Sequence, residues 1–232
     1  MFGLTPLDLG AITIFALAWL CYHAVLEWSP YGARNLNHVM DRYRHAWMRQ
    51  MLSREVRIVD TQITASLQNG SAFFASSSLF AIGGALALLR SSADVQKLLV
   101  ELPLAIDATQ GTWELKSLGL TVMFVYAFFK FAWSYRLFNY AAIMMGSVPP
   151  AAYKDDPAAL AMADRTAKVH IIAARHFNRG QRALFFALGY LGWFVNAWIL
   201  LATTLAVLVV MLRRQHGPEF GDVFAGDPVA FK

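Results

Sequence analysis

Four stretches of this chain are long and apolar enough to cross a lipid bilayer, and no other feature constrains the fold as strongly. They cover about residues 6–27, 64–89, 117–140 and 183–211. A helix needs about 20 apolar residues to cross the hydrocarbon core of a membrane. The low charged fraction agrees, because only 15% of residues are charged against about a quarter in soluble domains. The sequence therefore predicts an all-α membrane protein with four transmembrane helices.

The distribution of positive charge predicts the orientation of these helices. Six Lys or Arg residues lie in residues 28–63 and six more in 146–182, but only three lie between the second and third helices. Cytoplasmic loops accumulate Lys and Arg, so the first two segments are expected in the cytoplasm. Both termini are then expected on the periplasmic side of a bacterial inner membrane. Arg213 and Arg214, directly after the fourth helix, do not follow this rule.

The segments outside the four stretches also carry recognisable patterns. Apolar residues recur every three to four positions in residues 35–60 and 158–177, which predicts two basic amphipathic helices in the cytoplasm. Residues 91–114 are expected to form a short outer helix. We interpret residues 1–212 as one membrane domain and residues 213–232 as an outer tail.

Charged and amide side chains in the aromatic third helix are the first candidates for function. Lys130, Arg136 and Asn139 lie among Phe, Trp and Tyr residues. Charges at membrane depth often mark an ion or substrate path. The alternative, which we favour, is that Lys130 and Arg136 extend to the headgroups, where Trp133 is an anchor. We also predict an ion pair between Arg136 and Asp60, which are expected at the same depth.

The second helix is unusually polar for a membrane span, with Gln68, Asn69 and the run Ser76–Ser78. These side chains could line a hydrophilic path or hydrogen-bond to neighbouring helices, and close packing through Ser77 and Ala81 is the interpretation that we favour. Asn178 is predicted to cap the fourth helix.

Recognisable sites for metals, cofactors and nucleophilic catalysis are missing from the sequence. The one ligand-like histidine spacing is His23 with Glu27, and two ligands are too few for a zinc site. The single cysteine, Cys21, has no partner for an internal disulfide, and no phosphate-binding loop or nucleophile motif occurs. We expect no cofactor and no metal, and we assign the net charge of +5 to membrane contact rather than to nucleic acid.

Three strings in the chain resemble a family of bacterial and plant integral membrane proteins that is defined only as a domain of unknown function. They are FFASSS from Phe73, FKFAWSYRLFNY from Phe129 and FNRGQR from Phe177. The resemblance implies four membrane helices and implies no activity. It directs attention to the matching positions, which are Lys130, Trp133, Arg136, Asn139, Asn178 and Arg182.

The function that these patterns favour is that of an accessory or scaffold protein of the membrane. Its expected partners are membrane lipids, including anionic headgroups, and either further copies of the chain or another membrane complex. A small oligomeric transporter or channel is the first alternative, and an enzyme acting on a lipid or quinone is the second. The candidate binding residues are Asp60, Asn69, Lys130, Trp133, Arg136, Asn139, Asn178 and Arg182.

Overall fold

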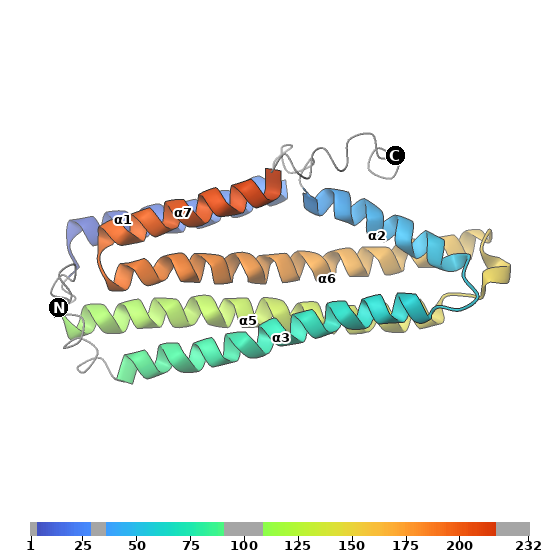
Figure 1. Ribbon diagram of the computed structural model, residues 1–232, viewed down its shortest axis with the longest axis horizontal. Coiled ribbons are helices and arrows are strands. Elements are labelled where there is room, and N and C mark those ends of the chain that lie inside the picture. Colours follow the sequence, from blue (N-terminus) through green and yellow to red (C-terminus); the bar gives the residue numbers. More distant parts are fainter. Residues whose placement is uncertain (1–3, 29–35, 91–108, 217–232) are drawn as a thin grey trace. The chain divides into compact units, whose positions relative to one another are not determined.

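The computed structural model describes residues 4–28, 36–90 and 109–216, and this part of the chain is all-helical. Its six α-helices are α1 (Pro6–Trp28), α2 (Leu36–Leu52), α3 (Ile58–Arg90), α5 (Gln110–Ser147), α6 (Pro157–Tyr190) and α7 (Ala197–His216), with short 3-10 turns at Ala151–Tyr153 and Leu191–Phe194 (Figure 1). Four of them, α1, α3, α5 and α7, are long and apolar enough to cross a membrane. The prediction of an all-α protein with four such helices is confirmed. Most of the expected outer helix and of the tail lies outside the described residues.

Local sequence explains where several of these helices begin. At the start of α1, the Asp8 amide donates to Thr5 Oγ1 and the Thr5 amide donates to Asp8 Oδ2, both at 3.1 Å. This reciprocal pair is a capping box. Asp156 accepts a hydrogen bond from the Ala158 amide at 2.7 Å, and Pro157 occupies the first position of α6, where proline costs no hydrogen bond.

The contacts group the chain into two compact units. Unit 1 comprises residues 1–32, 76–128 and 181–215, and unit 2 comprises residues 33–75, 129–180 and 216–232. Each unit is built from several separate stretches of sequence and has its own core. The single membrane domain over 1–212 stays a prediction.

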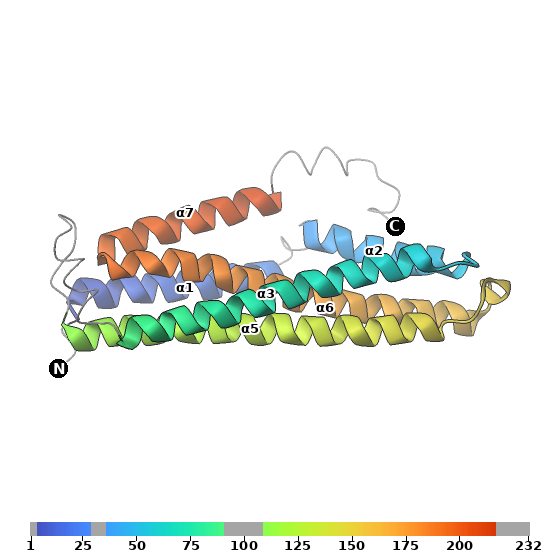
Figure 2. The ribbon, with the colours of Figure 1, turned by 60° about the horizontal axis from the view of Figure 1, so that its bottom comes forward.

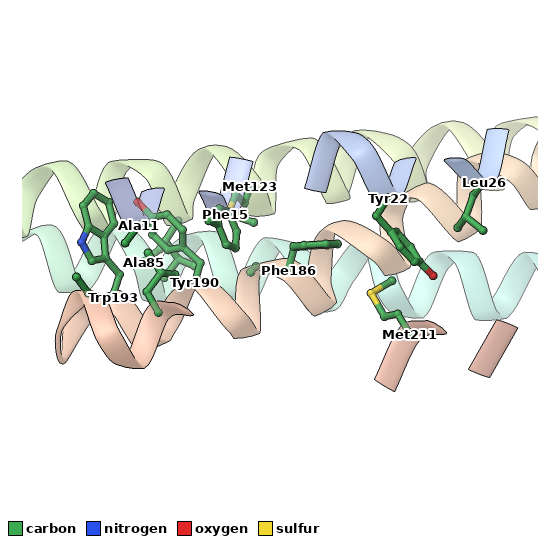
Figure 3. Close-up of a cluster of buried hydrophobic side chains, with 14 residues drawn as sticks. Ala11, Phe15, Tyr22, Leu26, Ala85, Met123, Phe186, Tyr190, Trp193 and Met211 are labelled. Atoms are coloured by element: carbon green, nitrogen blue, oxygen red, sulfur yellow. The ribbon is translucent and has the colours of Figure 1, made fainter. Parts of the chain in front are cut away.

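Aromatic side chains dominate the core of unit 1 (Figure 3). Phe186 of α6 is fully buried and contacts three rings of α1. It stacks on Trp19 at a centroid distance of 5.8 Å and meets Phe15 and Tyr22 edge-on or tilted. Ring pairs of this kind add stability beyond the area that they bury. This cluster fixes the last turns of α6 against α1.

Unit 2 is organised by α2 lying antiparallel to the first half of α6. Asn178 donates to Asn37 near the start of α2, and Arg49 near its end donates to Asp164. Around the Arg49 end of α2, its methionines pack against small residues and against the end of α5. The cluster consists of Met48, Met51, Leu52, Met145, Val148, Ala159, Ala163 and Ala167. The alanines of α6 leave room for the methionine side chains. The two basic segments therefore pack on each other along one face.

The helix predicted over 183–211 is wrong as a single element. α6 continues without interruption from Pro157 to Tyr190, and the chain turns back at residues 191–196 before α7 begins (Figures 1 and 2). Gly192 permits this turn, because a Cβ there would lie 2.9 Å from the carbonyl oxygen of Ile199. Asn196 caps α7 by accepting a hydrogen bond from the Ile199 amide at 2.9 Å. Asn178, which we expected as the cap, lies inside α6.

Within unit 1, α7 consequently runs parallel to α1. It begins beside Trp193, whose indole donates to Asp8 at the start of α1. Toward its other end, Met211 lies beside Tyr22 near the end of α1 (Figure 3). The expectation that both termini lie on the periplasmic side assumed a single helix at 183–211, where the structure has the end of α6 and then α7. The membrane side of each terminus stays a prediction.

The first amphipathic helix is also shorter than predicted, and the following span is longer. α2 ends at Leu52 rather than near residue 60, and α3 begins at Ile58 rather than at 64. The intervening turn is anchored by Arg57, whose guanidinium donates to the carbonyls of Val148, at 2.7 Å, and of Pro149. Hydropathy did not identify the first turns of α3, because these turns contain polar residues.

Candidate functional site

Three ionisable side chains meet in unit 1 where α1 ends and α6 enters the unit. His23 and Glu27 lie one helical turn apart on α1, and Arg182 projects from α6. Arg182 Nη2 donates to Glu27 Oε1 at 2.7 Å and lies 3.4 Å from His23 Nδ1. His23 Nε2 in turn lies 3.4 Å from Glu27 Oε2. Arg182 is buried, with 6% of its surface exposed, so its charge must be compensated locally.

Further polar groups surround this Glu27 end of unit 1. Arg214 of α7 places its guanidinium over the Phe185 ring, 5.4 Å from the centroid. The Tyr22 hydroxyl and Gln215 Oε1 are buried and have no hydrogen-bond partner in the described part of the chain. We call Tyr22, His23, Glu27, Arg182 and Arg214 the Glu27 cluster. It combines two guanidinium groups, one carboxylate, one imidazole and one unsatisfied hydroxyl.

A second polar arrangement holds the opposite end of unit 1. The buried ammonium group of Lys116 donates to the Trp193 carbonyl at 2.6 Å and lies 5.2 Å from the centroid of the same indole. The Trp193 indole donates to Asp8 Oδ1 at 2.8 Å. These contacts tie the starts of α1 and α5 to the turn between α6 and α7. Their geometry is that of a structural clamp.

In unit 2, Asp60 is completely buried but does not pair with Arg136 as predicted. Its Oδ1 accepts hydrogen bonds from Trp47 at 2.7 Å and from Arg54 at 2.5 Å. Arg136 instead donates to the Tyr140 hydroxyl at 2.7 Å, on the next turn of its own helix. The predicted ion pair is therefore wrong. Arg54 lies on the turn before Asp60 and is much closer to it along the chain than Arg136. Arg136 was predicted as the partner because the two residues are expected at the same depth and have opposite charge.

His170 is the most unusual side chain of unit 2. It is fully buried in α6, and neither ring nitrogen has a hydrogen-bond partner in the residues described. The rings of Trp47 and Phe138 lie 5.0 Å and 5.7 Å from it. Burial and the nearby positive charge of Arg44 lower the pKa of His170 to about 4. The imidazole is therefore neutral at pH 7 and packs as an aromatic ring.

Salt bridges join α2 to α6 on the more exposed side of their contact. Arg49 forms a two-pronged pair with Asp164, at 3.1 Å for both bonds, and Arg175 donates to Asp41 at 3.1 Å. The hydrogen bond from Arg49 lowers the pKa of Asp164. Asp41 and Asp164 are thus committed to the α2–α6 contact.

The polar residues of α3 in unit 2 mostly bond to neighbouring helices. Gln68 donates to Asn139 of α5 at 2.7 Å. Ser71 lies 3.3 Å from Ser134 of α5, which donates to the Ala173 carbonyl of α6 at 2.8 Å. This pattern agrees with the packing interpretation. Asn69 differs, because it is exposed on α3.

The other predicted site residues do not converge on one place. Trp133 and Arg136 are exposed on α5, and the Trp133 ring meets His176 edge-on at 6.5 Å. Lys130 is half-buried on the same helix. Asn178 bonds to Asn37 in unit 2, whereas Arg182 belongs to unit 1. Whether these residues bind a ligand stays a prediction.

Sequence reasoning missed Asp8, Lys116, Trp193 and His170. The Thr5–Asp8 spacing of a capping box was the one signal that pointed to Asp8. Lys116 was counted as an outer-loop charge, and nothing in the sequence places it against Trp193. No group of three or more His, Cys, Asp or Glu side chains in the described residues could hold a metal ion.

Helices of this length and hydropathy, packed through aromatic and interhelical polar contacts, define a multi-pass α-helical membrane protein. Residues 10–218 match the family model for the protein of unknown function DUF599, and the chain belongs to this family. No curated protein and no solved structure matches the chain.

Proposed function

We propose that this chain is an accessory or scaffold protein that binds an acidic surface of another membrane complex through unit 2. The observation that supports this is the concentration of positive charge. The described residues of unit 2 contain twelve Lys and Arg against six Asp and Glu, a net charge of +6, whereas those of unit 1 contain five against three, a net charge of +2. Most of the charge imbalance of the protein is therefore on one unit.

Two basic side chains on α6 are the best placed to meet such a partner. Arg165 and Lys168 are exposed, one turn apart, and form no ion pair with any described residue. The nearby carboxylates of Asp41 and Asp164 already bond to Arg175 and Arg49. Along α6, Lys168 lies 14 residues or about 21 Å from Arg182, more than twice the Debye length of about 8 Å. This spacing favours a protein partner over headgroups located near Arg182.

The orientation that we propose places the N-terminus outside and the C-terminus in the cytoplasm. α1 carries the chain inward, α3 outward and α5 inward, so the Arg-rich segments around α2 and α6 are cytoplasmic. The end of α6 leads outward again, and α7 returns parallel to α1. Arg213 and Arg214 are then cytoplasmic, and the exception to the charge rule disappears. A bacterial inner membrane is the compartment to which this rule applies most directly.

The interhelical bonds of Gln68, Ser71, Ser134 and Asn139 support this role over that of a channel. A conduit would need polar side chains that remain available to a passing solute. In unit 2 these side chains bond to one another instead. The transporter alternative is therefore less favoured than it was from the sequence alone.

Native mass spectrometry on protein gently extracted from its own membrane tests the proposal. We expect a stoichiometric partner with the wild-type chain and with Lys154→Glu, an exposed control on the turn before α6. The Arg165→Glu/Lys168→Glu variant should lose at least about tenfold in partner affinity, since like charges at a contact are repulsive. Retention of the same partner by the double variant would contradict the proposal. The proposal would also be contradicted if anionic lipid were the only ligand that the double variant loses.

A further inference from the structure

The two guanidinium groups of the Glu27 cluster have different partners in the described part of the chain. Glu27 faces Arg182 directly, and His23 lies against the second carboxylate oxygen. Arg214 has no carboxylate partner in the described part of the chain, and its printed contact is with the face of Phe185. A guanidinium that rests on a ring keeps its N–H donors available at the edge. Arg214, which is exposed on α7, is thus available to an anionic ligand.

The cluster also contains a buried donor with nothing to bond. Tyr22 is 6% exposed, and its hydroxyl has no hydrogen-bond partner in the residues described. Figure 3 shows the ring directed toward the part of α7 that carries Met211. Arg214 follows Met211 by about one turn of α7. A buried hydroxyl without a partner is costly and rare in folded proteins, so the site is built as if a ligand completes it.

The depth of the cluster indicates where such a ligand would come from. Asp8 and Glu27 are 19 residues apart on α1, which corresponds to about 28 Å of helix. The hydrocarbon core of a bilayer is about 30 Å thick. The Glu27 end of α1 therefore reaches the level of lipid headgroups if the Asp8 end lies at the opposite surface.

We propose that Tyr22, Arg182 and Arg214 form a binding site for a phosphate group. Phosphate offers several acceptor oxygens to guanidinium and hydroxyl donors at once, and its negative charge complements the positive charge of Arg214. A phospholipid headgroup and free phosphate share this chemistry. Gln215 Oε1, a buried acceptor without a partner on the residue after Arg214, matches a headgroup that carries a hydroxyl. This site is separate from the exposed α6 residues of the proposed function.

The test measures binding to the full chain, purified in detergent and stripped of lipid. The probes are phosphatidylglycerol, a diacylglycerol with the same acyl chains, and inorganic phosphate, each titrated by native mass spectrometry. We expect phosphatidylglycerol to bind at least about tenfold more tightly than diacylglycerol, because only the former brings the phosphate. Comparable binding of inorganic phosphate would identify free phosphate as the ligand. Equal binding of the two lipids would overturn the proposal.

Matched variants separate the site from general surface charge and from folding. Tyr22→Phe removes only the hydroxyl and Arg214→Gln only a charge, and each should weaken phosphatidylglycerol about tenfold without lowering the thermal stability of the lipid-free protein. Tyr190→Phe, in the same core, and Arg213→Gln, at the adjacent and likewise exposed arginine, should change affinity less than twofold. Unchanged affinity in Tyr22→Phe and Arg214→Gln would overturn the proposal, as would an equal loss in Arg213→Gln.

Discussion

Individual buried polar residues in this protein are satisfied by contacts between helices that are distant in the sequence. Lys116 bonds to a carbonyl 77 residues away, and Arg182 pairs with Glu27 across 155 residues. Depth in the membrane and opposite sign are therefore weak guides to pairing. Asp60 illustrates this, because it bonds to Trp47 and Arg54 rather than to Arg136.

His170 predicts a pH dependence of stability in unit 2. Its folded-state pKa of about 4 lies below the ordinary value of 6.5, so the unfolded chain takes up a proton first as pH falls. The contribution of neutral His170 to the free energy of unfolding is therefore fully present above pH 6.5. It is lost as pH falls from 6.5 to 4, by roughly 3 kcal/mol in total. His170→Phe keeps a ring between Trp47 and Phe138 and should flatten this dependence.

Thermal unfolding in detergent between pH 7 and 4.5 measures this effect. An equally steep slope in His170→Phe would assign the pH dependence to other groups.

Lys116 provides a second prediction at this scale. Lys116→Met removes the donor to the Trp193 carbonyl and should lower the free energy of unfolding by about 1–3 kcal/mol, because the carbonyl is left buried and unpaired. Lys154→Met, at an exposed lysine, should change it by less than about 0.5 kcal/mol. Denaturation with a detergent titration gives both values, and equal effects would argue against the clamp.

Glycine has opposite roles at two positions of α6 and of the turn that follows it. Gly180 lies inside α6 and does not interrupt it. It makes room for the Phe131 ring, which would lie 2.8 Å from a Cβ at this position. Gly192 permits the turn before α7 because a Cβ would meet both Thr203 and the Ile199 carbonyl. The same residue type therefore supports packing at one site and reversal at the other.

A matched pair of glycine substitutions tests this account. Gly192→Ala should destabilise the protein by about 1–3 kcal/mol, since backbone atoms must shift. Gly10→Ala, inside α1 with open space around it, should stabilise it by about 0.5–1 kcal/mol through helix propensity. The unfolding free energies of the two variants should thus change in opposite directions. Stabilisation by Gly192→Ala would show that the turn does not depend on this glycine.

The spans were predictable because hydropathy and length report directly on the bilayer. Their ends were less predictable, and the clearest failure was the helix over 183–211. In the apolar run from Leu184 to Leu212, only Gly192 and Asn196 indicate a reversal of the chain. Glycine and asparagine also occur inside helices, so this signal is weak. Two residues that bond to Trp193 in this turn, Lys116 and Asp8, lie far away in the sequence. The sequence indicated only the His23–Glu27 part of the Glu27 cluster. Arg182 and Arg214 lie on other helices, and only the folded chain brings them near α1.

At the scale of the whole molecule, the reversal after α6 makes α7 run back along unit 1, and the membrane orientation that we propose for the end of α7 follows from it. α1 and α7 are parallel within unit 1, so the two ends of the described chain in this unit point to opposite sides. The family match over residues 10–218 includes α7. The arrangement therefore concerns the part of the chain that the family model covers.

A reporter fusion placed after His216 tests this central claim most directly. The chain is expressed in a bacterium with either green fluorescent protein or alkaline phosphatase at that position, and with the same reporters inserted at residue 100 as an internal reference. The account predicts fluorescence without phosphatase activity after His216 and phosphatase activity at residue 100. Active phosphatase at both positions would place both on the same side and would contradict the parallel arrangement of α1 and α7.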